Sequence, residues 1–573
     1  MLFRGISASP GIAIGRALLL KENKYKIFKK IVSDSITEKQ RLENAVTKAK
    51  EELKIIITNA EKKLGKEKVK IFEAHLLMLD DPEFIGVIIS KILYENVNAE
   101  YAVKVTSEDI AAIFETLDDS YMKERAADVR DVSIRLINIL MEIKTISISN
   151  IQDKCILIAH DLTPSDTAQI DKENVLGFIT EIGGVTSHSA IIARTIGVPA
   201  VVGLEKGLLN IKNNDLIILD GNEGLIIINP DEGILKDYKD KIRYQQIFRE
   251  ELIKYKNIDT KTMDGIKVEV SCNIGSIEDL NAALENGAEG IGLFRTEFLY
   301  MSKDKLPTED EQFNAYKEVL ENMNKKSVII RTLDIGGDKN LSYLKIDNEL
   351  NPFLGYRAIR LCLGTKDIFK VQLRALLKAS NYGNLKIMFP MICNVEEITE
   401  AKKLLEECKE ELKRENIEYD DKVQVGIMIE VPSAAIISDI LAEEVDFLSI
   451  GTNDLMQYTL AVDRMNEKVS YLYDFYNPAV LRLINIIVRN ANQKGKYVGM
   501  CGEMAGKKEL IPLLLGMGLR EFSMNASSIL EIRKEINDLK FEKCRGLANK
   551  LDDLRTSKEV RELLNGVPEL REE

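Results

Sequence analysis

Two hydrophobic patterns divide the chain and predict different elements. From about residue 35 to 144, apolar positions recur three to four residues apart in a glycine-poor stretch rich in Glu, Lys, Leu and Ile, which predicts helices. Breaks near Gly65, Asp81–Pro82 and Asn96 divide this stretch into roughly four helices, so we expect a helical bundle. Runs of β-branched and aliphatic residues flank the bundle and predict short strands at 1–20, 154–160, 175–182, 198–203 and 215–228.

The second half of the chain repeats a strand followed by a helix. Strand-like runs lie at 267–274, 290–296, 327–334, 385–392, 423–430, 446–453, 497–503 and 520–525. Most of the intervening segments have a helical period, and so does the charged tail at 530–568. Eight such units over roughly 260 residues are typical of a (β/α)8 barrel.

Together the two patterns predict a multidomain α/β protein. We expect a β-containing domain of residues 1–22 and 145–230, a helical insert at 23–144, a helical linker at 231–257 and a TIM barrel at 258–573.

Composition and charge narrow the class of protein. The 573 residues carry a net charge of −13, which argues against nucleic acid as the main partner because a polyanion needs a basic surface. No run approaches the ~18 apolar residues of a membrane span, and the first residues lack the pattern of a signal peptide. The seven cysteines are scattered without a CxxC pair, which indicates neither disulfides nor a structural zinc site. We therefore expect a cytoplasmic protein without membrane insertion.

His188 is one of only three histidines and lies between a glycine-rich turn and a predicted helix start. Gly183 and Gly184 permit backbone angles closed to other residues, and Thr186 or Ser187 can cap the helix. The first turn of a helix concentrates unpaired N–H groups, which favour the negative charge of a phosphoryl group. On this segment alone, phosphoryl acceptance and a merely structural capping histidine are about equally supported.

Cationic side chains gather where the predicted barrel strands end, which is the end at which such barrels carry their active sites. Arg295 and Arg331 follow neighbouring strands, and a guanidinium group suits phosphate or carboxylate. Lys339 adds a point charge, and Arg357 and Arg464 fall in loops of the same face. This set predicts a small, highly charged anion as substrate.

Other groups at these strand ends suit metal binding and proton transfer. Glu430 and Asp454 offer the oxygen ligands that Mg²⁺ prefers, and Cys501 can give or take a proton. Any one of these residues, taken alone, would more often form a strand-end ion pair. A joint set of complementary groups on one rim favours a phosphate-bearing substrate with a divalent metal.

Eight long stretches follow the pattern of one enzyme family, in order along the chain. They are SPGIAIG at 9–15, DLTPSDTAQ at 161–169, GGVTSHSAIIAR at 183–194, GLFRTEFLYM at 292–301, RTLDIGGDK at 331–339, NPFLGYRAIR at 351–360, SIGTNDLMQYTLAVDRMNEKV at 449–469 and GMCGEMAG at 499–506. By these stretches the chain resembles the Enzyme I family of the bacterial phosphotransferase system, the phosphoenolpyruvate-protein phosphotransferases. The resemblance covers essentially the full length.

The resemblance implies an activity and a role for each candidate residue. His188 would take the phosphoryl group of phosphoenolpyruvate on Nε2 and pass it to a histidine of the small carrier HPr, with release of pyruvate, as the first step of sugar uptake. The further implied roles are phosphate binding by Arg295, Arg331 and Lys339, binding of the carboxylate end and remaining oxygens by Asn453, Arg464 and Arg357, Mg²⁺ binding (with Mn²⁺ as the alternative) by Glu430 and Asp454, protonation of the enolate by Cys501, and a place beside His188 for Thr167.

The resemblance also assigns roles to the domains. The helical insert would dock HPr, the barrel would form a homodimer, and the β-containing domain would swing between barrel and insert, with hinges near residue 145 and at 231–257. Two departures from the family pattern concern loops: Lys507–Lys508 stand where an acidic residue is usual, and Phe475 replaces a common proline.

Three other classes remain as alternatives. Pyruvate phosphate dikinase and phosphoenolpyruvate synthase share the histidine domain and the barrel, but they need a nucleotide-binding domain for which this chain shows no P-loop pattern. A nitrogen-system paralogue would carry a sensory domain before residue 1. A non-catalytic regulator that senses phosphoenolpyruvate would be expected to have lost reacting residues, whereas His188, Cys501 and Glu430 are all present.

Overall fold

The structure is a computed structural model of the 573-residue chain. It describes all residues except 21–26, 65, 117–119, 144–147, 149–150, 168–169, 185–186, 205–209, 302, 304, 337–340, 342, 345–348, 465, 467 and 566–573. The side chains of 59–64, 66–71, 120–124, 127, 164–165, 188, 191 and 195 also lie outside the description. The chain divides into two compact units, Met1–Gln246 and Ile247–Glu573.

An eight-stranded sheet forms the β-containing part of the first unit, in the order β1-β8-β7-β3-β4-β5-β6-β2. Its strands are β1 (Leu2–Arg4), β2 (Ile6–Ser9), β3 (Ile12–Leu19), β4 (Cys155–Ala159), β5 (Val175–Thr180), β6 (Ala200–Val202), β7 (Leu216–Asp220) and β8 (Leu225–Ile228). Strands β3, β4, β5 and β6 are parallel neighbours, and β7 and β8 form an antiparallel hairpin. The predicted strand at 215–228 is therefore two strands, because the turn between them includes Gly224 at a φ of 66°.

Two short helices connect these strands along the chain: α6 (Pro164–Thr167) follows β4, and α7 (His188–Ile196) follows β5. Pairing of β3 with β4 brings residues from before and after the helical insert into one sheet.

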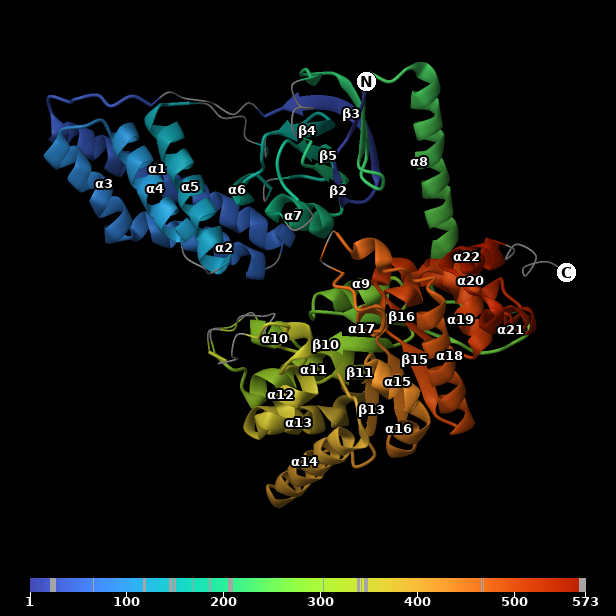
Figure 1. The fold of residues 1–573 in the computed structure, drawn as a ribbon. Coiled ribbons are helices and arrows are strands. Elements are labelled where there is room, and N and C mark those ends of the chain that lie inside the picture. The colour runs from blue at the N-terminus through green and yellow to red at the C-terminus, as the bar shows by residue number, and fades with distance from the viewer. Residues whose placement is uncertain are drawn as a thin grey trace. The chain divides into compact units, whose positions relative to one another are not determined.

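Five helices form the insert in the described part of the chain, where roughly four were expected. They are α1 (Ser35–Leu64), α2 (Lys66–Asp80), α3 (Pro82–Glu95), α4 (Ala99–Thr116) and α5 (Ser120–Leu140). Helices α1, α4 and α5 lie side by side (Figure 1) around a core that includes Leu42, Leu53 and Ile88. His75 is buried in this bundle, where Nε2 lies 3.3 Å from Asp128 Oδ1, as a packed histidine would.

A single helix, α8 (Glu232–Ile253), lies between the sheet domain and the barrel along the chain, where the charged helical linker was expected. None of its residues is buried. Its first half is tied to the sheet domain by an ion pair of 3.4 Å between Lys241 and the buried Asp220.

Eight parallel strands close into a barrel in the second unit, which confirms the predicted barrel fold. They are β9 (Glu269–Ile274), β10 (Ile291–Arg295), β11 (Ser327–Arg331), β12 (Asn384–Phe389), β13 (Gln424–Ile429), β14 (Phe447–Ile450), β15 (Tyr497–Met500) and β16 (Glu521–Met524).

Helices surround this barrel (Figure 1). They are α9 (Asp279–Glu285), α10 (Phe298–Met301), α11 (Glu309–Asn322), α12 (Ala358–Gly364), α13 (Lys366–Ala379), α14 (Val395–Arg414), α15 (Pro432–Ile436), α16 (Ser438–Glu444), α17 (Thr452–Leu460), α18 (Pro478–Gln493), α19 (Ile511–Met517), α20 (Ile529–Asn537), α21 (Phe541–Ala548) and α22 (Ser557–Asn565). One large apolar core joins the helices to the outward side chains of the strands.

The period of two along each strand explains what fills the barrel. A separate apolar cluster inside it consists of Leu293, Ile329, Met388, Met428, Phe447 and Cys501. Two residues after a member of this layer, the same inward face of a strand carries Arg295, Arg331, Glu430 or Ser449. Alternation alone thus places polar side chains at the carboxyl ends of the strands, above an apolar layer.

Among the described residues, no helix is both long enough and apolar enough to cross a membrane.

Candidate functional site

Arg331 is the centre of a buried charge cluster at the carboxyl ends of the barrel strands. Its residue is only 7% exposed, Nη2 donates to Glu297 Oε1 at 2.6 Å, and Nη1 lies 3.0 Å from Asp334 Oδ2. Burial alone would lower the pKa of Arg331, but the carboxylates of Glu297 and Asp334 outweigh it and raise that pKa. Arg331 therefore stays charged inside the barrel mouth.

Arg357 shares the same acidic partner. It precedes α12, and its Nε and Nη2 donate to Asp334 Oδ1 at 3.2 and 2.8 Å. Within the described part of the chain, Arg331 Nε and Arg357 Nη1 are buried and have no hydrogen-bond partner. Two oriented guanidinium groups with free donors are suited to an anionic ligand, because an unpaired buried donor costs free energy.

The other predicted cations lie closer to solvent. Arg295 ends β10 and is exposed at the barrel mouth. Neighbouring atoms still remove part of its guanidinium group from bulk water, and this desolvation, followed by the positive charge of Arg331, lowers the pKa of Arg295. Arg464 is exposed in the loop after α17, and its main-chain N–H donates to Gln457 Oε1 at 3.5 Å. Lys339 lies outside the described residues.

Two carboxylates converge near the buried arginines. Glu430 follows β13, is 1% exposed, and accepts a hydrogen bond of 2.7 Å from the N–H of Met391. Burial, and then the negative charges of Asp454 and Asp334, raise the pKa of Glu430 well above its usual value. Asp454 lies in the first turn of α17 and is half-buried.

This crowding of negative charge fits a divalent cation. Oxygen donors on Glu430 and Asp454 suit Mg²⁺, whose charge would relieve the repulsion between them. In the part of the chain that the structure describes, no three His, Cys, Asp or Glu side chains gather as a complete metal site. Two protein carboxylates are what Mg²⁺ needs when substrate and water supply the remaining ligands.

Cys501 follows β15 and points into the barrel. It is 3% exposed, and Ser449 Oγ donates to its sulfur at 3.3 Å. Burial raises the pKa of the Cys501 thiol to about 11, against the opposing influence of Ser449 and Arg331. The sulfur is therefore a protonated thiol at neutral pH and can act as an acid.

Asn453 is fixed by a reciprocal pair of hydrogen bonds. Its Nδ2 donates to Glu503 Oε1 at 3.1 Å, and its Oδ1 accepts from the N–H of Glu503 at 3.0 Å. The Tyr473 hydroxyl also donates to its carbonyl at 3.1 Å.

The two departures from the family pattern meet beside this group. The Lys507 ammonium lies 5.5 Å from the centre of the Phe475 ring, a cation–π distance, and Phe475 packs edge-on against Tyr473. Lys507 and Phe475 therefore contact each other beside Tyr473, whose hydroxyl donates to the main-chain carbonyl of Asn453.

His188 is the first residue of α7 in the sheet domain. Ser187 is the N-cap, with its hydroxyl accepting from the Ala190 N–H at 3.4 Å, as the sequence predicts, and Gly183 has a φ of 117°. Thr186 and the side chain of His188 lie outside the described residues. Thr167 ends α6, which packs against α7, and its buried hydroxyl donates to the Thr163 carbonyl at 3.1 Å.

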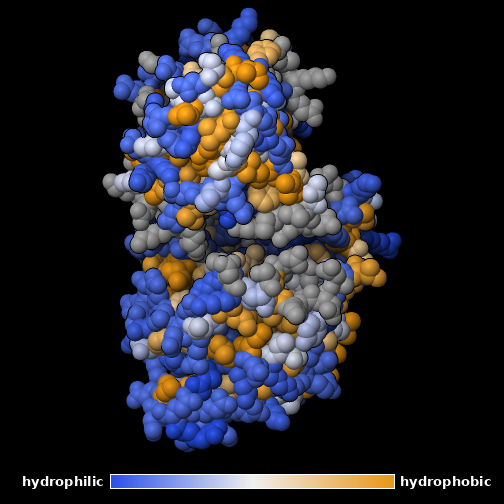
Figure 2. Space-filling view, turned by 90° about the vertical axis from the view of Figure 1, so that its left-hand side faces the viewer, coloured by the Kyte–Doolittle hydropathy of each residue, from blue (hydrophilic) through white to orange (hydrophobic). Residues whose placement is uncertain are grey.

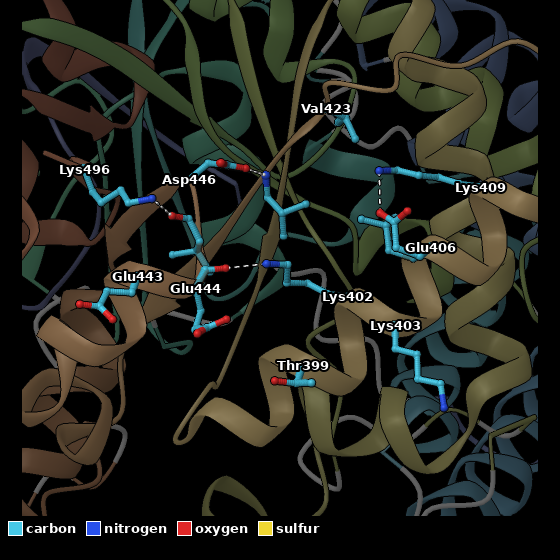
Figure 3. Close-up of a pocket in the computed structure, with 13 residues that line it drawn as sticks. Thr399, Lys402, Lys403, Glu406, Lys409, Val423, Glu443, Glu444, Asp446 and Lys496 are labelled. Atoms are coloured by element: carbon cyan, nitrogen blue, oxygen red, sulfur yellow. Dashed lines mark hydrogen bonds and ion pairs between the residues drawn. The ribbon is translucent and has the colours of Figure 1, made fainter. Parts of the chain in front are cut away.

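A pocket of about 450 Å³ lies at the amino ends of β13, β14 and β15. Figure 3 shows the residues that line it. Its lysines serve the fold: Lys402 and Lys496 donate to the carbonyls of Glu444 and Val445, at the end of α16, at 2.8 and 2.7 Å. None of the predicted site residues lines it. Since barrels of this kind react at the carboxyl ends of their strands, the rim around Arg331 is the better site.

Three residues of this rim had no role predicted from their sequence positions. Glu297 and Asp334 stand at strand ends in the sequence, but their pairing with Arg331 and Arg357 depends on side-chain geometry. Ser449 is a polar residue on a buried strand. The alternation of side chains along that strand could have predicted that Ser449 faces the inside of the barrel.

Comparisons with known proteins agree with this architecture. Three families match: PEP-utilising enzyme, N-terminal, over residues 4–125; PEP-utilising enzyme, mobile domain, over 151–224; and PEP-utilising enzyme, PEP-binding domain, over 249–541. A phosphoenolpyruvate-protein phosphotransferase of Bacillus subtilis (strain 168) is 52% identical over 97% of this chain and 98% of its own length. One of Staphylococcus aureus (strain MRSA252) is 52% identical over 98% and 99%. A solution structure of Enzyme I (nEIt) is 44% identical over 43% of this chain and 99% of its own, with a TM-score of 0.40. Three matching domains and this identity over nearly the whole length mean that the chain belongs to the PEP-utilising enzymes and, within them, to the phosphoenolpyruvate-protein phosphotransferases.

Proposed function

We propose that this enzyme transfers the phosphoryl group of phosphoenolpyruvate to His188 and then to a histidine of the carrier protein HPr, releasing pyruvate as the first step of sugar uptake by the phosphotransferase system. The observation that supports this most is the buried rim of the barrel. There, paired arginines, two carboxylates and a protonated thiol follow the carboxyl ends of neighbouring strands. A phosphorylated enol carboxylate uses all three kinds of group: cations for its anionic ends, carboxylates for a divalent metal and an acid for its carbon.

The arginines hold the two anionic ends of the substrate in this proposal. Arg295 and Arg331, with Lys339, bind the phosphate, while Arg357, Asn453 and Arg464 bind the carboxylate and remaining oxygens. Asp334 orients both Arg331 and Arg357 before substrate arrives, so little ordering remains to be done on binding. Positioning and charge neutralisation account for most of the catalysis in phosphoryl transfer.

Glu430 and Asp454 would hold Mg²⁺, with Mn²⁺ as the alternative. Bound there, the ion would supply positive charge that stabilises the negative charge of the reacting groups. Glu430 is buried away from bulk water, where electrostatic interactions are stronger than in solvent.

Cys501 acts as the acid that completes pyruvate formation. When the phosphoryl group leaves, the enolate oxygen becomes a carbonyl, carbon 3 takes the thiol proton, and the sulfur keeps the electron pair as a thiolate. A thiol pKa of about 11 ensures that the donor is protonated beforehand.

His188 receives the phosphoryl group at the start of α7, where main-chain N–H groups favour negative charge. Thr167, at the end of the neighbouring α6, sits beside it. Because donor site and carrier lie on separate domains, the phosphohistidine domain (1–22 and 145–230) swivels between the barrel at 258–573 and the insert at 23–144. The proposed hinges are the linker at 231–257 and the segment near residue 145, which lies outside the described residues.

The helical insert docks HPr in this proposal. On α2, Glu73, Leu77 and Asp80 are exposed and spaced to share one face, with Leu77 71% exposed. Figure 2 shows hydrophobic side chains between hydrophilic ones on the surface that faces the viewer. An apolar anchor beside carboxylates suits a basic protein partner.

Self-association through the barrel domain is also part of the proposal. Sedimentation equilibrium of the full chain should give a homodimer, and a concentration-independent monomer would contradict it.

Labelled phosphoenolpyruvate tests the central step. Full-length protein, Mg²⁺ and HPr should yield acid-labile label on both proteins, and His188→Ala should abolish it. His160→Ala is the matched control, because His160 pairs with Glu181 at 2.7 Å in the same domain and should not carry label. Label on His160 or on a residue other than histidine would overturn the proposal. Transfer to ADP or AMP would favour a dikinase or synthase.

Leu77→Ala tests the docking surface separately. We expect it to slow transfer from phosphorylated enzyme to HPr about tenfold or more while phosphorylation by phosphoenolpyruvate stays unchanged, because an anchor side chain carries much of the binding energy. Rapid-quench transfer kinetics measure both steps. Ile36→Ala, which removes a similarly exposed side chain from α1, should change neither step; equal loss in both variants would remove the α2 face from docking.

A further inference from the structure

The Cys501 sulfur lies on an apolar floor. The inner layer beneath it consists of Leu293, Ile329, Met388, Met428 and Phe447. Two hydrogen bonds reach the sulfur among the described residues: it accepts from Ser449 Oγ at 3.3 Å and donates to the Ile450 carbonyl at 3.8 Å. Among the described residues, the Ser449 hydroxyl is therefore the hydrogen-bond donor to this thiol.

The barrel wall fixes the position of Ser449. Ser449 pairs with Gly499 and Ile450 with Met500 across parallel strands β14 and β15, and the Cys501 N–H donates to the Ile450 carbonyl at 3.1 Å. Ser449 is 1% exposed, and a hydroxyl buried at this depth costs free energy unless it is hydrogen-bonded. The register of two strands thus sets the distance from hydroxyl to sulfur.

We propose that Ser449 is a positioning residue that orients the Cys501 thiol for proton donation to the enolate and stabilises the thiolate left behind. The inference rests on the proposed role of Cys501. As the S–H bond breaks, the proton forms the new C–H bond at carbon 3 of the enolate, and the sulfur retains both electrons. The Ser449 O–H continues to donate to that sulfur, and water later restores the thiol proton.

A charged sulfur needs this donor more than a neutral one does. The thiolate forms above apolar side chains, where few groups can solvate it, and a hydrogen bond to a charged group is stronger than one to a neutral group. The interaction therefore grows as the proton leaves, so it stabilises the transition state more than bound substrate.

Ser449→Ala isolates the hydroxyl. We expect kcat for pyruvate formation to fall about 10- to 100-fold, the range for one hydrogen bond to a charged group, with little change in the KM for phosphoenolpyruvate. Exchange of pyruvate methyl protons with D2O, followed by NMR with the Mg²⁺-loaded full chain, should slow by a similar factor. Calorimetric binding of phosphoenolpyruvate and the thermal unfolding midpoint should stay near wild type.

Two further variants keep the test decisive. Ser449→Thr retains a hydroxyl and should recover most of both rates, whereas Ser271→Ala should change neither, because the buried Ser271 hydroxyl on β9 donates to Glu269 at 3.0 Å instead. Loss of methyl exchange in Cys501→Ala, together with normal exchange in Ser449→Ala, would overturn the positioning role alone. Normal pyruvate formation in Cys501→Ala would overturn the proton-donor role itself. A raised KM with unchanged kcat in Ser449→Ala would mean that the hydroxyl serves substrate binding.

Discussion

At the scale of single residues, Asp334 is the most connected group of the site. One carboxylate, 3% exposed, contacts both Arg331 and Arg357, and each arginine keeps a buried donor without a described partner. The carboxylate therefore does two tasks: it stabilises two buried cations and holds both guanidinium groups in place. Removing its charge should affect stability and substrate affinity together.

We predict that Asp334→Asn lowers the free energy of unfolding by about 3 kcal/mol, because it removes the carboxylate partner of the buried Arg357 and leaves Arg331 with Glu297 alone. The KM for phosphoenolpyruvate should rise as both arginines lose their orientation. Urea unfolding and steady-state kinetics measure the two effects. Glu443→Gln removes an exposed partner of Lys494 and should cost less than about 0.5 kcal/mol with unchanged KM; a similar loss in both variants would contradict the argument.

Strand alternation made much of this rim predictable from the sequence. Arg331, Glu430 and Cys501 stand at inward strand ends, which can be counted from the apolar residues before them. The clamp of Asp334 on two arginines was not predictable, because Arg357 comes from a loop more than twenty residues away in sequence. Contacts of that kind depend on the conformation of the loops above the barrel, which the hydrophobic period of the sequence does not determine.

At the scale of elements, the sequence predicted the boundaries that a glycine, a proline or a change of hydrophobic period marks. It missed a helix boundary that none of these marks. The eight barrel strands all occur where their apolar runs predict them, with ends that differ by a few residues. The boundary between α4 and α5 was missed because residues 116–120, TLDDS, contain neither glycine nor proline. Asp and Ser are residue types that often precede a helix, which is a weaker sequence signal than glycine or proline.

Helix α7 is short, so its cap should matter to the histidine it begins with. Ser187→Ala removes the N-cap acceptor and should destabilise the local helix by about 1 kcal/mol. We expect slower phosphorylation of His188, measured by rapid quench, and faster amide hydrogen exchange in α7. Thr308→Ala removes the cap of α11 in the barrel, with a comparable local cost, and should leave phosphorylation unchanged; an equal slowing by both variants would show that general destabilisation is responsible.

At the scale of the whole barrel, polar groups occupy both ends of an apolar layer. The substrate rim lies at the carboxyl ends of the strands, and Glu521 and Glu269 lie in register on neighbouring strands at the other end. Tyr497 and Ser271 donate to Glu269 at 3.2 and 3.0 Å, while Glu521 is 2% exposed. Burial, and then the negative charge of Glu269, favour the protonated form of the Glu521 carboxyl.

The barrel should therefore lose stability as pH rises through neutrality. Burial, and then the charge of Glu269, raise the pKa of Glu521 from its ordinary 4.5 to about 8 in the folded chain. Between those values the folded state keeps a proton that the unfolded state releases, so the contribution is fully present below pH 4.5 and is lost as pH approaches 8. Glu521→Gln replaces the neutral acid with a neutral amide and should remove this dependence.

Urea unfolding at pH 5, 6, 7 and 8 measures the difference between variant and wild type. That difference should shift in favour of Glu521→Gln as pH rises, by at most about 1.4 kcal/mol per pH unit. Glu285→Gln, at an exposed carboxyl of α9, should give a curve parallel to wild type. A curve for Glu521→Gln that also ran parallel would mean that Glu521 is ionised in the folded barrel, and the raised pKa of Glu521 would have to be abandoned.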